Sequence, residues 1–154
     1  MENRSVIAAF LGLAAASLLW LALLNQSPSL GGFTILARDG SVIVADVDVV
    51  SYSASGHEMT LTKECAARLE AGRYMEGTFT IIVDGGVAMS GTFVPPIISR
   101  SYPSNEVIIT YPSFDLRYGT MKIQMGYPWA MPGSPGVADS ALVKHFASTG
   151  RLAP

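Results

Sequence analysis

Residues 57–93, HEMTLTKECAARLEAGRYMEGTFTIIVDGGVAMSGTF, contain the pattern that decides the fold. Thr62 is a residue type that caps helix N-termini, Glu64 stands in the first turn, and Gly72 can end the helix. We therefore predict a helix over residues 63–71. Cys65, Ala66 and Leu69 share one side at helical spacing and are its predicted inner face.

The second half of this stretch predicts a β-hairpin. Residues 78–83 and 87–93 are rich in β-formers, and Asp84-Gly85-Gly86 between them is typical of a tight turn. Pro95-Pro96 ends the pattern. Outward from the hairpin, further strands are predicted at 33–37, 41–52, 57–61, 106–111 and 120–125. A bulge is expected near Asp46 and Asp48.

A last helix is predicted from about Ala138 to Ser148, with Asp139 near its start and Gly150 after its end. Leu142, His145 and Phe146 would share one face of it. The sum is an α+β fold with a mostly antiparallel sheet and two short helices.

An apolar segment precedes this domain. Val6–Leu24, VIAAFLGLAAASLLWLALL, contains no charge, and at about 1.5 Å per helical residue it matches a hydrocarbon core of about 30 Å. A cleaved signal peptide would have a shorter apolar region and small residues at a cleavage site, whereas Leu24-Asn25-Gln26-Ser27 offers no such site. We therefore predict a single transmembrane helix that precedes the α+β domain.

The segments around the span predict its orientation. Arg4 precedes it and the next charge, Arg38, lies well beyond it, so the positive-inside rule predicts a cytoplasmic N-terminus. The predicted organisation is a cytoplasmic stub and anchor over residues 1–24, a tether over 25–32, and a domain outside the cytoplasm over 33–154. The expected location is the cell membrane.

Composition excludes some function classes. The net charge is −2 and the sequence pI is about 5.6, without a run of Lys or Arg, so nucleic-acid binding lacks the basic surface that it needs. One cysteine, Cys65, permits no disulfide within the chain. No cofactor is predicted.

Residues 46–110 resemble one known family. His57–Glu70 is followed by Ile81-Ile82-Val83-Asp84-Gly85 and then by Pro95-Pro96-Ile97. This order is similar to the head region of the first extracytoplasmic domain of the protein-export proteins SecD and SecDF. Those proteins have many transmembrane helices and this chain has one predicted span. The resemblance therefore implies an α+β subdomain that handles extended polypeptide, without proton-driven translocation and without catalytic residues.

Aromatic residues gathered late in the chain are the candidate protein-binding residues, because interfaces favour aromatic side chains. Packing in strands and in the core is the alternative explanation of their presence. The six residues are Tyr102, Tyr111, Phe114, Tyr118, Tyr127 and Trp129.

Two other hypotheses use the rarer side chains. A copper site could be built from Met121, Met125, Met131 and His145, because thioethers and imidazole bind Cu(I) outside the cytoplasm. Core packing is the alternative for the methionines. A hydrolase could use Cys65 as nucleophile, because a helix N-terminus lowers a thiol pKa, with His57 or His145 as base. A small buried residue is the alternative for Cys65.

The leading hypothesis is a non-enzymatic, membrane-anchored domain that binds protein. It would be an accessory subunit of a membrane complex, with other membrane proteins as partners, or a SecD-head-like module that handles polypeptide near the outer surface. Asp46, Asp48 and Asp84 are expected in turns or facing solvent, since no calcium-loop spacing follows them.

Overall fold

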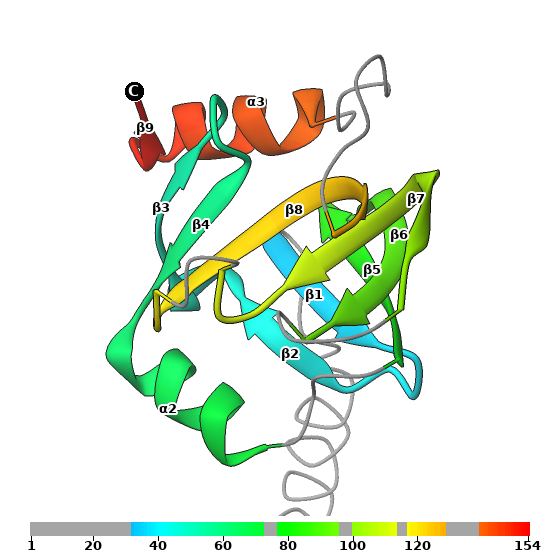
Figure 1. The fold of residues 1–154 in the computed structure, drawn as a ribbon. Coiled ribbons are helices and arrows are strands. Elements are labelled where there is room, and N and C mark those ends of the chain that lie inside the picture. The colour runs from blue at the N-terminus through cyan, green and yellow to red at the C-terminus, as the bar shows by residue number, and fades with distance from the viewer. Residues whose placement is uncertain (1–31, 73–76, 96–99, 114–116, 129–138) are drawn as a thin grey trace, which may run out of the picture.

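The computed structural model describes residues 32–72, 77–95, 100–113, 117–128 and 139–154 (Figure 1). Its strands form one sheet in the order β2-β1-β5-β6-β7-β8-β4-β3-β9. The bounds are β1 Phe33–Ala37, β2 Val42–Ala45, η1 Asp46–Asp48, β3 Val49–Ser53, β4 Glu58–Leu61, α2 Lys63–Ala71, β5 Gly77–Val83, β6 Gly86–Val94, β7 Tyr102–Thr110, β8 Thr120–Tyr127, α3 Ser140–Ser148 and β9 Leu152–Ala153.

The helix and the hairpin that the opening stretch predicts are both confirmed. Thr62 Oγ1 accepts a hydrogen bond from Cys65 N at 3.2 Å, which satisfies one of the free N–H groups at the start of α2, and Gly72 is the C-cap. β5 and β6 are joined at Asp84 and Gly85, whose φ angles are +49° and +83°. Such angles suit a tight turn between two antiparallel strands.

The predicted strand over residues 41–52 is wrong in one respect, because a 3-10 turn divides it. Ala45 N donates to Asp48 Oδ2 at 2.8 Å, so a side chain takes the hydrogen bond that a continuous strand would make with a neighbour. The chain turns through η1 and starts again as β3. The expected bulge near Asp46 and Asp48 is in fact this turn.

The sheet is mixed. Among the described residues, six strand pairs are antiparallel, whereas β6–β7 and β3–β9 are parallel. The fold is therefore α+β with two helices among the described residues, as predicted, but its sheet is not purely antiparallel. β9 was not predicted, since two residues carry no periodic pattern.

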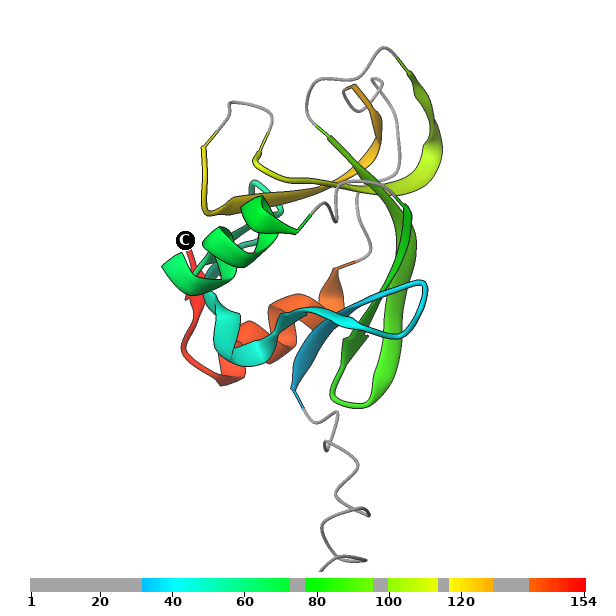
Figure 2. The same cartoon turned by 90° about the horizontal axis from the view of Figure 1, so that it is seen from below.

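The sheet is strongly curved (Figure 2). α3 packs against both β1 and β3, two strands that are far apart in the strand order of the sheet. Phe146 of α3 packs against Phe33 of β1 and Tyr52 of β3, with 5.3 Å between ring centroids in both pairs. Leu142, His145 and Phe146 are the buried residues of α3, as the helical spacing predicts. One main core thus joins both halves of the sheet.

Within the described ranges, no helix is both long enough and apolar enough to cross a membrane. The predicted anchor, Val6–Leu24, lies outside those ranges, as does the predicted tether up to residue 31.

Candidate functional site: a groove beside α2

A groove of about 370 Å³ lies between α2 and residues 118–120, where β8 begins. Lys63, Ala66, Ala67 and Glu70 recur at i, i+3, i+4 and i+7, so they form one stripe of the helix facing the groove. Cys65 and Leu69 occupy a different face and are buried in the core. The small side chains of Ala66 and Ala67 leave space between the Lys63 cation and the Glu70 anion. These two residues are about 10 Å apart along the helix axis.

Tyr118 is a prominent residue on the other side of this groove. Its relative exposure is 70%, and it lies with Gly119 and Thr120 just before and at the start of β8. A large, exposed aromatic ring beside a groove is typical of a protein-binding surface. Tyr102, Tyr111, Tyr118 and Tyr127 are the predicted aromatic residues that the structure describes, and among them the placement of Tyr118 best suits the role.

Tyr111 lies beneath the same region and is 3% exposed. Its hydroxyl accepts from Gly119 N at 3.3 Å and lies 3.4 Å from both Ala66 O and Glu70 Oε1. It therefore links α2 to the segment that carries Tyr118. This placement favours a positioning role for Tyr111 over direct contact with a partner.

The remaining predicted aromatic residues do not join this groove. Tyr102 and Tyr127 pack edge to face, with ring centroids 6.4 Å apart, in a small second cluster with Val94 and Ile108. Tyr127 is 4% exposed, so it is a packing residue there. Phe114 and Trp129 lie outside the described residues.

The environment of Cys65 differs from the one that a nucleophile needs. Its side chain is fully buried, and burial raises the pKa of the thiol to about 11, more than the nearby Arg68 lowers it. A helix N-terminus lowers the pKa of a thiol, but the cost of burying a thiolate is larger here. A buried thiol of this kind favours the packing role.

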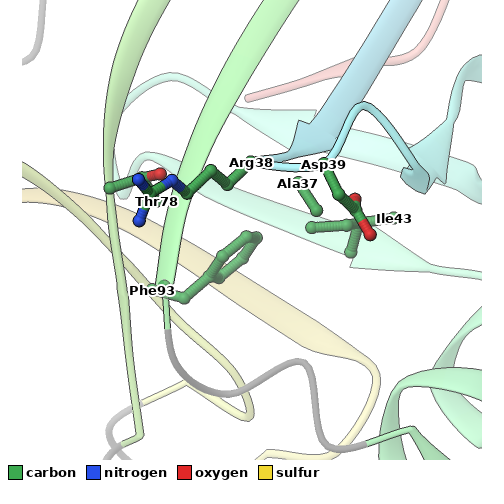
Figure 3. Close-up of a pocket in the computed structure, with 7 residues that line it drawn as sticks. Ala37, Arg38, Asp39, Ile43, Thr78 and Phe93 are labelled. Carbon is green, nitrogen blue, oxygen red and sulfur yellow. The ribbon is translucent and has the colours of Figure 1, made fainter.

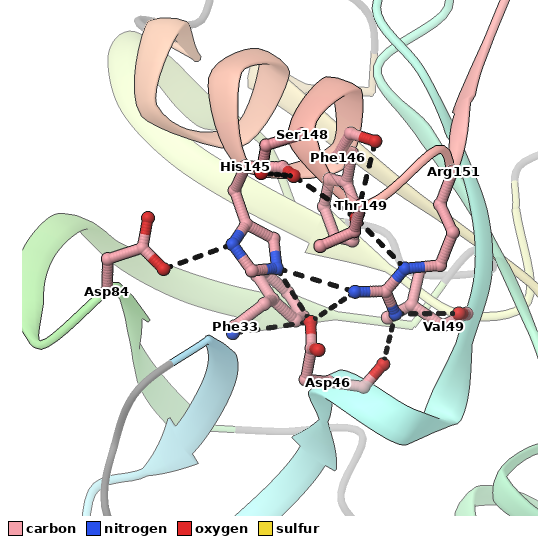
Figure 4. A network of polar contacts seen from close by, with 9 residues as sticks. All are labelled: Phe33, Asp46, Val49, Asp84, His145, Phe146, Ser148, Thr149 and Arg151. Carbon is pink, nitrogen blue, oxygen red and sulfur yellow. Dashed lines mark hydrogen bonds and ion pairs between the residues drawn. The ribbon is translucent and has the colours of Figure 1, made fainter.

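His145 is the centre of a polar network (Figure 4). Its Nε2 lies 2.7 Å from Asp46 Oδ1, and its Nδ1 lies 3.1 Å from Asp84 Oδ1. Arg151 donates to Asp46 Oδ1 at 2.7 Å and also to the carbonyl oxygens of Asp46 and Val49. The network holds α3 against η1 and the β5–β6 turn, so Asp46 and Asp84 are not simply solvent-facing.

Asp46 should make the domain sensitive to acid. Burial raises the pKa of its carboxyl, but hydrogen bonds from His145 and Arg151 outweigh burial and hold it below the ordinary 3.8. Its contribution to stability is therefore complete above pH 3.8 and is lost as the pH falls through the lower folded-state pKa. We expect Asp46→Asn to lower the free energy of unfolding at pH 7 by about 1–2 kcal/mol.

Chemical denaturation at several pH values checks this expectation. The difference between the wild type and Asp46→Asn should shrink as the pH falls below 3.8, because the wild type then loses the same charge. A difference that stays constant down to low pH would contradict the assignment.

The four residues of the copper hypothesis have different surroundings. Met121 is fully buried in the core and faces Met59 in the β4–β8 register, while Met125 packs against the same core from a half-buried position. Both ring nitrogens of His145 face carboxylates. Met131 lies outside the described residues, and within those residues no three His, Cys, Asp or Glu side chains are grouped to hold a metal ion. The observed contacts favour packing for Met121 and anchoring for His145.

His57 has an aspartate partner that the sequence did not indicate. Its Nδ1 lies 3.1 Å from Asp139 Oδ2, which also accepts from Tyr52 Oη at 2.7 Å. Burial, and then the hydrogen bond and charge of Asp139, raise the pKa of the Tyr52 hydroxyl, so this group stays a donor. The contacts among His57, Tyr52 and Asp139 fix the start of α3 against β3. The network around His145 fixes the end of the same helix.

A second pocket, of about 530 Å³, lies beside the β1–β2 turn (Figure 3). Its walls include the buried Ile43 and Phe93, but the exposed Arg38 and Asp39 flank it with opposite charges. Asp39 Oδ1 is held by Ser41 N and Oγ at 2.9 and 2.7 Å. The described residues that line this pocket contain no convergent set of polar groups that selects one ligand.

The part of the groove that α2 provides could not be recognised from the sequence alone. Lys63, Ala66, Ala67 and Glu70 stand at recognisable helical spacing, but only the tertiary structure shows that this stripe faces Tyr118.

Comparisons of the chain with protein-family models, with curated proteins and with solved structures found no match.

Proposed function

We propose that this chain is a non-enzymatic, membrane-anchored domain that binds a polypeptide segment of a partner protein in the groove between α2 and Tyr118. The observation that carries the proposal is the exposed Tyr118 ring beside a groove with small alanines and with Lys63 and Glu70. A segment that fits would place an acidic group near Lys63 and a basic group near Glu70.

The membrane part of this proposal depends on the apolar sequence of Val6–Leu24. A short tether would keep the groove close to the outer surface of the bilayer, where segments of other membrane proteins are available. The resemblance of residues 46–110 to the SecD head supports the same kind of partner, because that region is associated with extended polypeptide outside the membrane.

The test is a mild-detergent pull-down of the tagged full-length chain from its native membrane, followed by mass spectrometry. We expect stoichiometric membrane proteins with the wild type, and at least about a tenfold loss with Tyr118→Ala, since a buried aromatic anchor contributes about 2 kcal/mol or more. Ala67→Arg, which fills the exposed groove, should cause a similar loss.

Val87→Ala is the matched control, because Val87 is equally exposed at 69% but lies at the β5–β6 hairpin, whose residues do not line the groove. It should retain all partners. Wild-type protein that is recovered alone, or partners that survive both groove substitutions, would refute the proposal.

A further inference from the structure

Main-chain groups on the outer edge of β2 form hydrogen bonds with two side chains. β2 is the first strand in the sheet order, and within the described ranges it pairs with β1 alone, so some of its main-chain groups point away from the sheet. Arg68 of α2 donates to Ile43 O at 3.4 Å, and Asp48 accepts from Ala45 N at 2.8 Å. Exposed edge groups of this kind are a template for pairing with another strand.

The two side chains that cover this edge are also bonded to each other. Arg68 Nη2 lies 2.7 Å from Asp48 Oδ2, in an ion pair whose side chains are 47% and 13% exposed. Because Asp48 belongs to η1 and Arg68 to α2, this pair ties the helix to the end of β2. Figure 1 shows α2 beside β2 at one end of the sheet.

Among the described residues, α2 is attached to the rest of the fold by a few apolar side chains, with Ala66 partly buried against the core, and by polar contacts that include the Tyr111 hydroxyl. Cys65 and Leu69 are its buried residues, and its opposite stripe forms the groove. Cys65 Sγ lies 3.5 Å from Arg68 Nη2, so the thiol is next to the ion pair. A helix with few buried side chains and a partly exposed polar attachment belongs to the less stable part of a structure.

We propose that α2 is a strap over the β2 edge and that the Arg68–Asp48 pair is the latch that holds the strap closed. Opening of the latch frees Ile43 O from Arg68 and exposes the Cys65 thiol. This conformational device goes beyond the proposed groove function, and it can be tested without a partner protein.

The test is the rate at which iodoacetamide labels Cys65, the chain's one cysteine, in the full-length protein in mild detergent without denaturant. We expect Arg68→Met to speed labelling about tenfold or more, since it removes charge-assisted hydrogen bonds but retains the length of the side chain. Asp48→Asn should act in the same direction.

Arg117→Met is the matched control. Arg117 pairs with Glu58 at 2.8 Å and is 55% exposed, but its partner lies on β4, an interior strand, and not on α2. The control should label at the wild-type rate. Low urea concentrations separate local from global opening, because release of the strap alone exposes little surface and its labelling rate should hardly change with urea.

Two results would overturn the proposal. One is equal labelling of the wild type and Arg68→Met. The other is acceleration that depends steeply on urea and extends to exchange at the β5–β6 core amides, because that result means global unfolding. Labelling also distinguishes the strap from the groove, since Tyr118→Ala should leave the labelling rate unchanged.

Discussion

Gly91→Ala should lower the free energy of unfolding by about 3 kcal/mol or more. A Cβ at this position would lie 1.9 Å from Val107 O and 2.8 Å from Phe79 Cζ. The carbonyl belongs to β7, the neighbour of β6 in the sheet, so it can move only if the two strands separate. The close-packed interior has no space to absorb such a shift.

Urea denaturation followed by circular dichroism measures this effect. Gly86→Ala is the control, because Gly86 is also in β6 but a Cβ there would meet Val83 O at an ordinary 3.6 Å. The control should change stability by less than about 1 kcal/mol. Equal unfolding midpoints for the two variants would show that β6 and β7 do not approach as closely as described.

Phe146→Ala should cost about 3–5 kcal/mol, the range found for large aromatic residues removed from cores. Its ring is fully buried and contacts the rings of Phe33 and Tyr52, while the Arg151 guanidinium carbon lies 5.3 Å from its centroid. The loss would leave a cavity between β1 and β3, which are joined there by α3 and not by strand pairing.

The same denaturation experiment checks this expectation, with Lys144→Ala as the control on the exposed side of α3. That variant should be nearly neutral, because alanine is a better helix former and no core contact is lost. Phe146→Leu should recover part of the loss. An alanine variant within about 1 kcal/mol of the wild type would mean that α3 contributes little to the core.

The local elements could be predicted because their signals lie within a few residues of one another. Thr62 and Gly72 mark the ends of α2, and the Asp84-Gly85 turn marks the hairpin. The division of residues 41–52 was missed, because it depends on which main-chain group the Asp48 carboxylate binds. Secondary-structure propensities do not predict which main-chain group the carboxylate binds.

The arrangement of strands and the polar networks could not be predicted. His145 and Asp46 are 99 residues apart in sequence, and the pairing of β1 with β5 leaves no local pattern. The residue type of Tyr118 makes it a candidate, but its place beside the groove depends on the tertiary structure. The α2 stripe could not be predicted, because α2 has polar residues on several faces. The sequence alone does not show which of these faces lies beside another segment.

The position of β1 has a mechanical consequence. This first described strand pairs with β2 on one side and with β5 on the other, and Asp84 N donates to Gly32 O just before it. A pulling force on the chain before Phe33, directed along β1, would shear the hydrogen bonds that join β1 to β2 and to β5. Many hydrogen bonds would then have to break together, whereas an edge strand pulled sideways opens one bond at a time. β1 is therefore well suited to bear a load that is applied to the chain before it.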